Sequence, residues 1–262
     1  MFGTVILDAY RSSERKQMAD AINEICDPRD SYGWSSAGLY CYWDYDTHEV
    51  LYIGLATDLA TRFKQHNGVL HSNTTGSKEE EINEYFKTHE MLGYTIFVQS
   101  PLSQPIISRN KDKYNDLLED TEFTLESLVD DLEIGRSDIR RAEGILIEAY
   151  RRKNGRYSKW NKIGGDIEGQ KMVMPNNINI VKSFVEPELY ECSPIVSRST
   201  IRELADNPSF VACEEFLHAV RMRMLSCGQT YEDALDITIK DDEYNSINRL
   251  YELNYFDKKL VV

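Results

Sequence analysis

The chain has 262 residues, of which 41% are hydrophobic, and its formal net charge is −14 at pH 7. This length accommodates one or two domains with a hydrophobic core. No run approaches the ~18 apolar residues of a membrane span, and the first residues lack the basic start and apolar stretch of a signal peptide. The five cysteines form no C-x-x-C pair, so we expect reduced thiols, no zinc site and a cytoplasmic protein.

The charge is unevenly distributed along the chain. Of the successive segments, residues 141–170 alone carry more Lys and Arg than Asp and Glu, by 7 to 4. An acidic protein is poorly suited to general DNA binding, because affinity for DNA depends on neutralising phosphates. A local basic patch still binds phosphate in a salt-sensitive way. We therefore predict that residues 141–170 contact DNA. The acidic surface of the rest of the chain could bind a protein partner. The predicted contact residues are Arg151, Arg152, Lys153 and Lys159.

The spacing of hydrophobic and turn residues predicts helices and short strands in the first two thirds of the chain. In chain order these are a helix over 13–25, a loop over 27–37, strands over 38–43 and 50–54, helices over 58–66 and 79–91, and a strand over 94–98. Thr57 is the expected N-cap of the second helix. An acidic stretch over 111–133 precedes a helix from Ser137 to about Lys153.

The pattern changes after Gly165. Residues 166–199 contain three prolines and are predicted to be irregular, and helices follow. Thr200 and Glu203 form the T-x-x-E pattern of a capping box. Farther on, the sequence favours solvated charges at Arg221 and Arg223 over DNA contacts. We expect an α/β (α+β) fold, with a small, mostly antiparallel sheet flanked by helices and a mainly helical C-terminal part.

Two tyrosines are predicted to lie together on the hairpin of the first two strands. A turn centred on Asp46 sets Tyr40 opposite Tyr52, and opposite side chains share a face. The helix that follows carries Arg62, whose planar guanidinium suits phosphate oxygens, and His66. The structural alternatives are ordinary strand tyrosines, a solvated arginine and a hydrogen-bonded core histidine.

The helix over 137–153 places a carboxylate in an unusual position. At about 100° per residue, Glu143 falls inside the apolar stripe and Glu148 falls on the solvent side. A carboxylate among core-facing residues is costly unless it is paired or binds a metal. The alternative to a metal ligand is an ion pair of Glu143 with Arg62 or Arg140.

Together these residues resemble the GIY-YIG nucleases, which include homing endonucleases, some restriction enzymes and the incision subunit of bacterial excision repair. The two signature tripeptides are G-L-Y at 38–40 and Y-I-G at 52–54. The family arginine, ten positions after the second signature tyrosine, matches Arg62, and the histidine four positions later is similar to the homing-enzyme subgroup. The family glutamate and asparagine match Glu143 in E-G-I-L-I and Asn161 in W-N-K-I-G-G.

The resemblance covers about residues 38–165 and has departures. Leu39 stands where the family usually has isoleucine, and the loop from Glu143 to Asn161 is longer than usual. The long gap before Glu143 implies an inserted segment. The division that follows is an N-terminal extension over 1–35, a nuclease-like domain over 36–168 with an acidic insertion near 100–135, and a helical C-terminal domain over 190–262 for DNA targeting or partner binding.

The resemblance implies a metal-dependent endonuclease that hydrolyses DNA phosphodiester bonds at selected sites. Glu143 would bind Mg²⁺, or Mn²⁺, because hard carboxylate oxygens suit these ions. Arg62 would stabilise the phosphate in the transition state. The alternative is a catalytically weak module that binds nucleic acid or protein on the same fold.

The general base is left open by the sequence. The resemblance implies that Tyr52 orients or deprotonates the attacking water while Tyr40 forms a hydrogen bond beside it. A phenol has an ordinary pKa of ~10, which must fall for proton abstraction. His66 and His71 are rivals with pKa values nearer neutrality, and the loop position of His71 favours it because a loop can face substrate.

Overall fold

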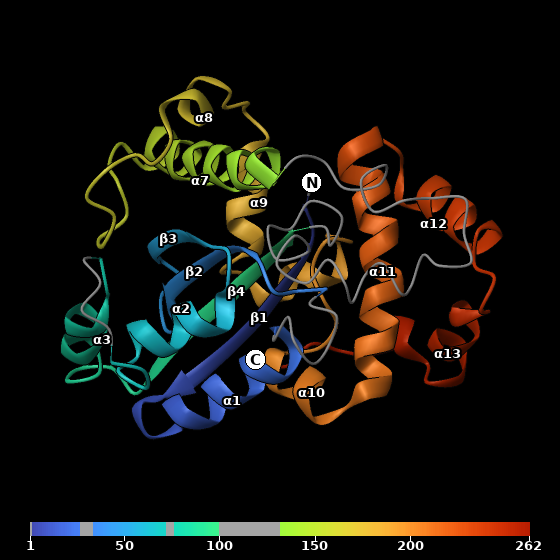
Figure 1. Ribbon diagram of the computed structural model, residues 1–262, viewed down its shortest axis with the longest axis horizontal. Helices are drawn as coiled ribbons and strands as arrows, with labels where there is room; N and C mark the ends of the chain where they lie inside the picture. Colours follow the sequence, from blue (N-terminus) through green and yellow to red (C-terminus); the bar gives the residue numbers. More distant parts are fainter. Residues whose placement is uncertain (1, 27–33, 72–75, 100–131) are drawn as a thin grey trace.

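The computed structural model describes residues 2–26, 34–71, 76–99 and 132–262 (Figure 1). It confirms the predicted fold class: a four-stranded antiparallel sheet with helices around it and a mainly helical C-terminal part. Within the described residues, no helix has both the length and the apolar character that crossing a membrane requires. The predicted acidic insertion lies outside the described residues up to position 131, and the predicted division into domains stays a prediction.

The sheet has the strand order β1-β4-β2-β3, with every neighbouring pair antiparallel. Its strands are β1 (Phe2–Arg11), β2 (Gly38–Asp44), β3 (Val50–Ala56) and β4 (Met91–Gln99). β1 was not predicted from the sequence. It is buried along almost its whole length, so it lacks the alternation of a half-exposed strand.

Helices cover both faces of the sheet. On one face, α1 (Arg15–Cys26) and α2 (Leu59–His66) pack on the tyrosines of β2 and β4. On the other face, α7 (Leu132–Asn154) and α9 (Asn177–Ser183) pack on Leu39, Trp43 and Ile53. The helix predicted over 79–91 is shorter, because α3 (Glu79–Tyr85) ends early and β4 begins at Met91.

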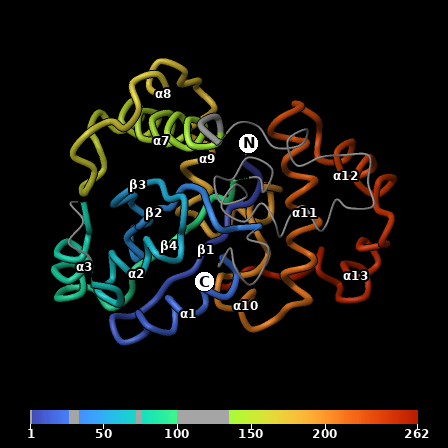
Figure 2. The backbone as a smooth tube through the Cα atoms, viewed as in Figure 1, coloured from blue at the N-terminus to red at the C-terminus, as the bar shows by residue number. Residues whose placement is uncertain are grey.

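The C-terminal part is mostly helical and lies against β1, as Figure 2 shows for the dark-blue strand and the orange helix α11. The capping box of Thr200 and Glu203 is confirmed. The further elements are η1 (Ser12–Glu14), α8 (Ile167–Lys171), η3 (Pro187–Glu191), α10 (Ile201–Asp206), α11 (Pro208–Cys227), α12 (Tyr231–Lys240), α13 (Ser246–Glu252) and η4 (Tyr255–Asp257).

A buried ion pair joins α11 to the N-terminal strand. The side chains of Arg221 and Glu214 are 2% and 0% exposed and pair directly, so the prediction of a solvated Arg221 was wrong. Arg221 also donates to the Thr4 hydroxyl and to two carbonyl groups of the segment that precedes α10. A charge at this depth requires such partners, because desolvation alone opposes its burial.

We predict that Arg221→Met lowers the free energy of unfolding by about 3–5 kcal/mol, because it leaves Glu214 buried without its cation. Urea unfolding measures the loss. Arg223→Met, on the same helix, is the matched control: its pair with Asp241 is exposed, so the expected loss is at most about 1 kcal/mol. Equal losses for the two variants would contradict a special role for the buried pair.

Candidate active site at the edge strand

The hairpin of β2 and β3 brings two signature tyrosines together, although in a different register from the predicted one. Tyr40 lies opposite Gly54, and Tyr42 lies opposite Tyr52. The hairpin turn is centred on Thr47 rather than Asp46. Asp44 accepts hydrogen bonds from the N–H groups of Asp46 and Thr47, and the register shifts after Tyr42. A shift of two positions keeps the face, and the rings of Tyr40 and Tyr52 lie 5.8 Å apart.

Gly54 leaves the space that these two rings occupy. A Cβ atom at this position would lie 2.6 Å from the Tyr52 ring and 2.7 Å from the Tyr40 hydroxyl oxygen. Any side chain here would therefore displace both tyrosines. The glycine of the Y-I-G tripeptide is explained by this close approach rather than by a special backbone conformation.

His66, the last residue of α2, fixes the orientation of the Tyr40 hydroxyl. The backbone N–H of Lys78 donates to His66 Nδ1 at 2.9 Å, and Nε2 lies 2.7 Å from the Tyr40 oxygen. Burial, together with the charges of Arg62 and Lys78, lowers the pKa of His66 to about 3. The ring is therefore neutral, and because Nδ1 accepts, Nε2 carries the proton and donates to Tyr40.

Tyr52 receives the next hydrogen bond in this series. The Tyr40 hydroxyl accepts from His66 and donates to the Tyr52 oxygen. Burial, and then the charge of Glu143, raise the pKa of Tyr52, whereas the bond from Tyr40 and the charge of Arg62 lower it. The ammonium group of Lys78 lies 5.0 Å from the centre of the Tyr52 ring.

Arg62 supplies a cation next to the two phenols. It lies one turn before His66 on α2, whose N-cap is Asp58 and not the predicted Thr57, since the Asp58 carboxylate accepts from the Thr61 N–H at 2.8 Å. Arg62 is half-buried, and in the described part of the chain it has no carboxylate within ion-pair distance. A guanidinium without an internal anion is suited to binding a phosphate.

Glu143 approaches the same edge of the sheet from α7. Burial, and then the charge of Asp166, raise its pKa to about 7, while a hydrogen bond from the Leu55 backbone and the charge of Arg62 lower it. Neither Arg62 nor Arg140 forms an ion pair with it among the described residues, so that structural alternative is not realised.

The surroundings of Glu143 fit a divalent cation held by a single carboxylate. A positive charge would relieve the two effects that raise the pKa of Glu143, namely burial and the anionic Asp166. Among the described residues, no three His, Cys, Asp or Glu side chains converge into a closed metal cage. One carboxylate with water and phosphate completing the shell is an arrangement typical of Mg²⁺.

Asn161 pairs with the outer edge of β3. Its side-chain oxygen accepts from the Ile53 N–H and its side-chain N–H donates to the Ile53 carbonyl, both at 2.9 Å. The Trp160 N–H donates to the carbonyl of Leu51, also on β3, at 2.8 Å. Asn161 therefore positions the strand that carries Tyr52 through hydrogen bonds to the backbone of the neighbouring residue, Ile53.

The predicted DNA-binding residues are partly engaged within the protein. Arg151 and Arg152 both donate to the carboxylate of Glu148, which lowers its pKa to about 2. Glu148 is 5% exposed, so its predicted solvent position was wrong: the two arginines cover it. Lys153 and Lys159 are exposed.

His71 and Lys78 are placed differently from what the sequence suggested. His71 is exposed beyond the end of α2, and in the described residues no hydrogen bond or ring contact joins it to the tyrosines, whereas His66 is in direct contact. Lys78 was missed by the sequence analysis. It precedes three glutamates, which is typical of a solvated helix start, yet it is 7% exposed.

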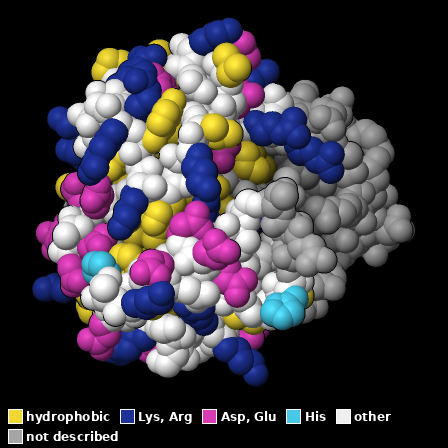
Figure 3. All heavy atoms as spheres, turned by 90° about the vertical axis from the view of Figure 1, so that its left-hand side faces the viewer, with side chains coloured by type: hydrophobic (Ala, Val, Ile, Leu, Met, Phe, Trp, Pro, Cys, Tyr) yellow, Lys and Arg dark blue, Asp and Glu magenta, His cyan; other side chains and the backbone are white. Residues whose placement is uncertain are grey.

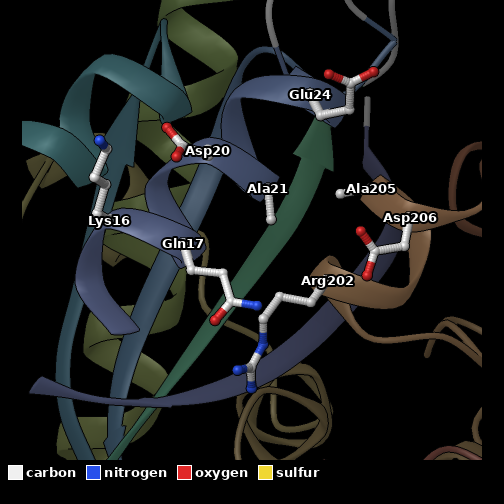
Figure 4. Close-up of a pocket in the computed structure, with 8 residues that line it drawn as sticks. All are labelled: Lys16, Gln17, Asp20, Ala21, Glu24, Arg202, Ala205 and Asp206. Atoms are coloured by element: carbon white, nitrogen blue, oxygen red, sulfur yellow. The ribbon is translucent and has the colours of Figure 1, made fainter. Parts of the chain in front are cut away.

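A second surface feature lies apart from this cluster. Side chains of α1 and α10 line a groove of about 480 Å³ (Figure 4). Asp20, Glu24 and Asp206 stand there with Lys16 and Arg202, and the Arg202 guanidinium is already paired with buried Asp8 at 2.8 Å. No residue of the tyrosine cluster lines this groove.

No protein-family model matches the chain, and no curated protein or solved structure resembles it significantly. The resemblance to the GIY-YIG nucleases therefore rests on the quoted residues alone.

We predict that Glu143→Gln stabilises the free protein at high pH. The raised pKa of Glu143, about 7 against an ordinary 4.5, means that the folded state binds this proton more tightly than the unfolded state. That contribution to stability is complete below the ordinary pKa and is lost as pH rises through the folded value. The variant stays neutral, so its melting temperature should exceed that of the native chain at about pH 8.5 and approach it at about pH 4.

Thermal melts without divalent cations, monitored by circular dichroism, measure this difference. Glu84→Gln is the control, since that carboxylate is exposed and paired with Lys87. A stability difference that is the same at both pH values would contradict the raised pKa.

Proposed function

We propose that this protein is a metal-dependent endonuclease that hydrolyses phosphodiester bonds of DNA, with a site of the GIY-YIG type. One observation carries the proposal. Five residues chosen from the sequence lie on strands β2 and β3, on helices α2 and α7 and in the segment after α7, and they act on one another although they come from distant parts of the chain. They are Tyr40, Tyr52, Arg62, Glu143 and Asn161.

The chemistry follows from the charges and hydrogen bonds of these residues. Glu143 would hold the cation, which when bound would offset negative charge on the phosphate and on the leaving oxygen. Arg62 would bind a non-bridging phosphate oxygen and stabilise the added charge of the transition state. Asn161 keeps β3, and with it Tyr52, in place.

Tyr52 would position the attacking water. Its raised pKa means that the phenol is protonated in the free protein. Removal of a proton from water requires that pKa to fall, which the hydrogen bond from Tyr40 and the charge of Arg62 favour. The neutral His66 contributes through Tyr40, and its lowered pKa makes it unsuited to accept a proton itself.

We predict that the purified chain relaxes supercoiled plasmid DNA in Mg²⁺ and that Glu143→Gln loses this activity by a factor of about 10² or more, because the cation is no longer held. Agarose gels with and without EDTA measure nicked and linear product. The exposed Glu84→Gln serves as the matched control and should cut at the native rate. Native protein that binds DNA but never cuts it in Mg²⁺ would favour the alternative, a module that binds without catalysis.

We predict that Lys78→Met slows cutting and moves the rising limb of the pH–rate profile to higher pH, because a nearby cation that favours the Tyr52 phenolate is removed. Lys78→Arg keeps the charge and should restore the profile. The backbone bond to His66 is retained in both variants. Lys87→Met, at an exposed lysine, is the control. A slower rate with an unshifted pH–rate profile would show that Lys78 supports the structure of the site and does not affect the pKa of Tyr52.

A further inference from the structure

Large hydrophobic side chains are exposed in one short segment next to the proposed site. Ile163 and Ile167 are 74% and 66% exposed, and Met172 and Met174 are exposed as well. Ile163 lies two positions after Asn161, which holds β3, and the segment continues through α8. Surface clusters of this kind mark binding sites when they are rimmed by polar residues.

The segment is held firmly against α7 by glycines. A Cβ atom on Gly144 would lie 2.4 Å from the Asp166 carbonyl oxygen, and one on Gly169 would lie 2.2 Å from the Arg141 carbonyl oxygen. A Cβ atom on Gly165 would lie 3.3 Å from a carboxylate oxygen of Glu143. The backbone that carries Ile163 and Ile167 therefore packs closely against α7, and Gly165, between them, lies next to Glu143.

Several cationic side chains lie in this segment and on the adjoining helix α7. Arg140, Arg141, Lys159 and Lys162 are exposed, and within the described ranges none of them forms an ion pair. Figure 3 shows hydrophobic side chains set among lysines and arginines on the upper part of this face, with acidic side chains gathered below. Positive charge without internal partners is complementary to a polyanion and sets this surface apart in a chain whose net charge is −14.

We propose that this surface binds duplex DNA, with Ile163 and Ile167 acting as a wedge that enters the minor groove and opens a base step beside the phosphate to be cut. Proteins that bend DNA use exposed isoleucine, leucine or methionine in this way, while neighbouring cations hold the backbone. The inference rests on the proposed function and adds to it the path of the DNA and the deformation of the substrate.

The test measures binding by fluorescence anisotropy of a labelled duplex in EDTA, so that cutting does not interfere. Ile163→Ser/Ile167→Ser should weaken binding by about tenfold for each side chain and leave its salt dependence unchanged. Lys159→Gln/Lys162→Gln should flatten the slope of log K against log salt by up to ~0.9 per lost phosphate contact. Val261→Ser, at an exposed residue near the C-terminus, is the apolar control and should bind as the native chain does.

A second measurement reports the wedge itself. A series of duplexes is prepared, each with 2-aminopurine at a different position. Binding of the native protein should increase the 2-aminopurine fluorescence at one base step, and binding of the isoleucine variant should not. Native affinity and an unchanged fluorescence signal in that variant would overturn the proposal. So would an isoleucine variant that only converts a dimer to a monomer, because the surface would then bind a second copy. If the native protein opens the duplex but does not cut it in Mg²⁺, the proposed nuclease function is wrong and the proposed DNA-binding surface is supported.

Discussion

The side-chain amide of Asn161 closes the outer edge of β3, and the proposed site depends on this pairing. An edge strand presents unpaired N–H and carbonyl groups, and Asn161 satisfies both groups of Ile53 as a neighbouring strand would. The chain then crosses the edge: α7 packs on one face of the sheet, while Trp160 packs with the tyrosines on the other. Because the chain crosses this edge, the charge of Glu143 on one face of the sheet raises the pKa of Tyr52 on the other face.

The far edge of the sheet is closed by different means. Val5 exchanges backbone hydrogen bonds with Ile195 and Ser197 across a parallel bridge. Behind this bridge, Arg221 and Glu214 tie α11 to the same strand. With both edges satisfied, the central strands are held between two packed faces, and the tyrosine rings of β2 have little freedom to move. The C-terminal helices therefore support β1 directly, whatever else they bind.

The sequence selected residues that lie near one another in the fold, but it did not predict their detailed geometry. Periodicity placed Glu143 among apolar residues, and spacing selected Arg62, because both signals are local. The predicted hairpin register differs from the observed one by two positions. The register shift after Tyr42 depends on the hydrogen bonds that Asp44 accepts from the loop, which no local pattern shows. Glu148 was misplaced because the covering arginines, and not the helix angle, decide its exposure. The burial of Lys78 follows from a long-range contact with Tyr52 that no local pattern contains.

The hydrogen bonds of the cluster run in one direction and end at Tyr52. Lys78 donates to His66, His66 donates to Tyr40, and Tyr40 donates to Tyr52. Each donor orients the next, so the series favours negative charge on the Tyr52 oxygen, which the anionic Glu143 opposes. The charge of Glu143 therefore couples its own protonation to that of Tyr52. Neutralisation of Glu143 by a proton or a cation therefore lowers the pKa of Tyr52, and only the cation leaves Glu143 deprotonated. If Glu143 binds a cation as proposed, that binding would also lower the pKa of Tyr52, so the two properties would be linked.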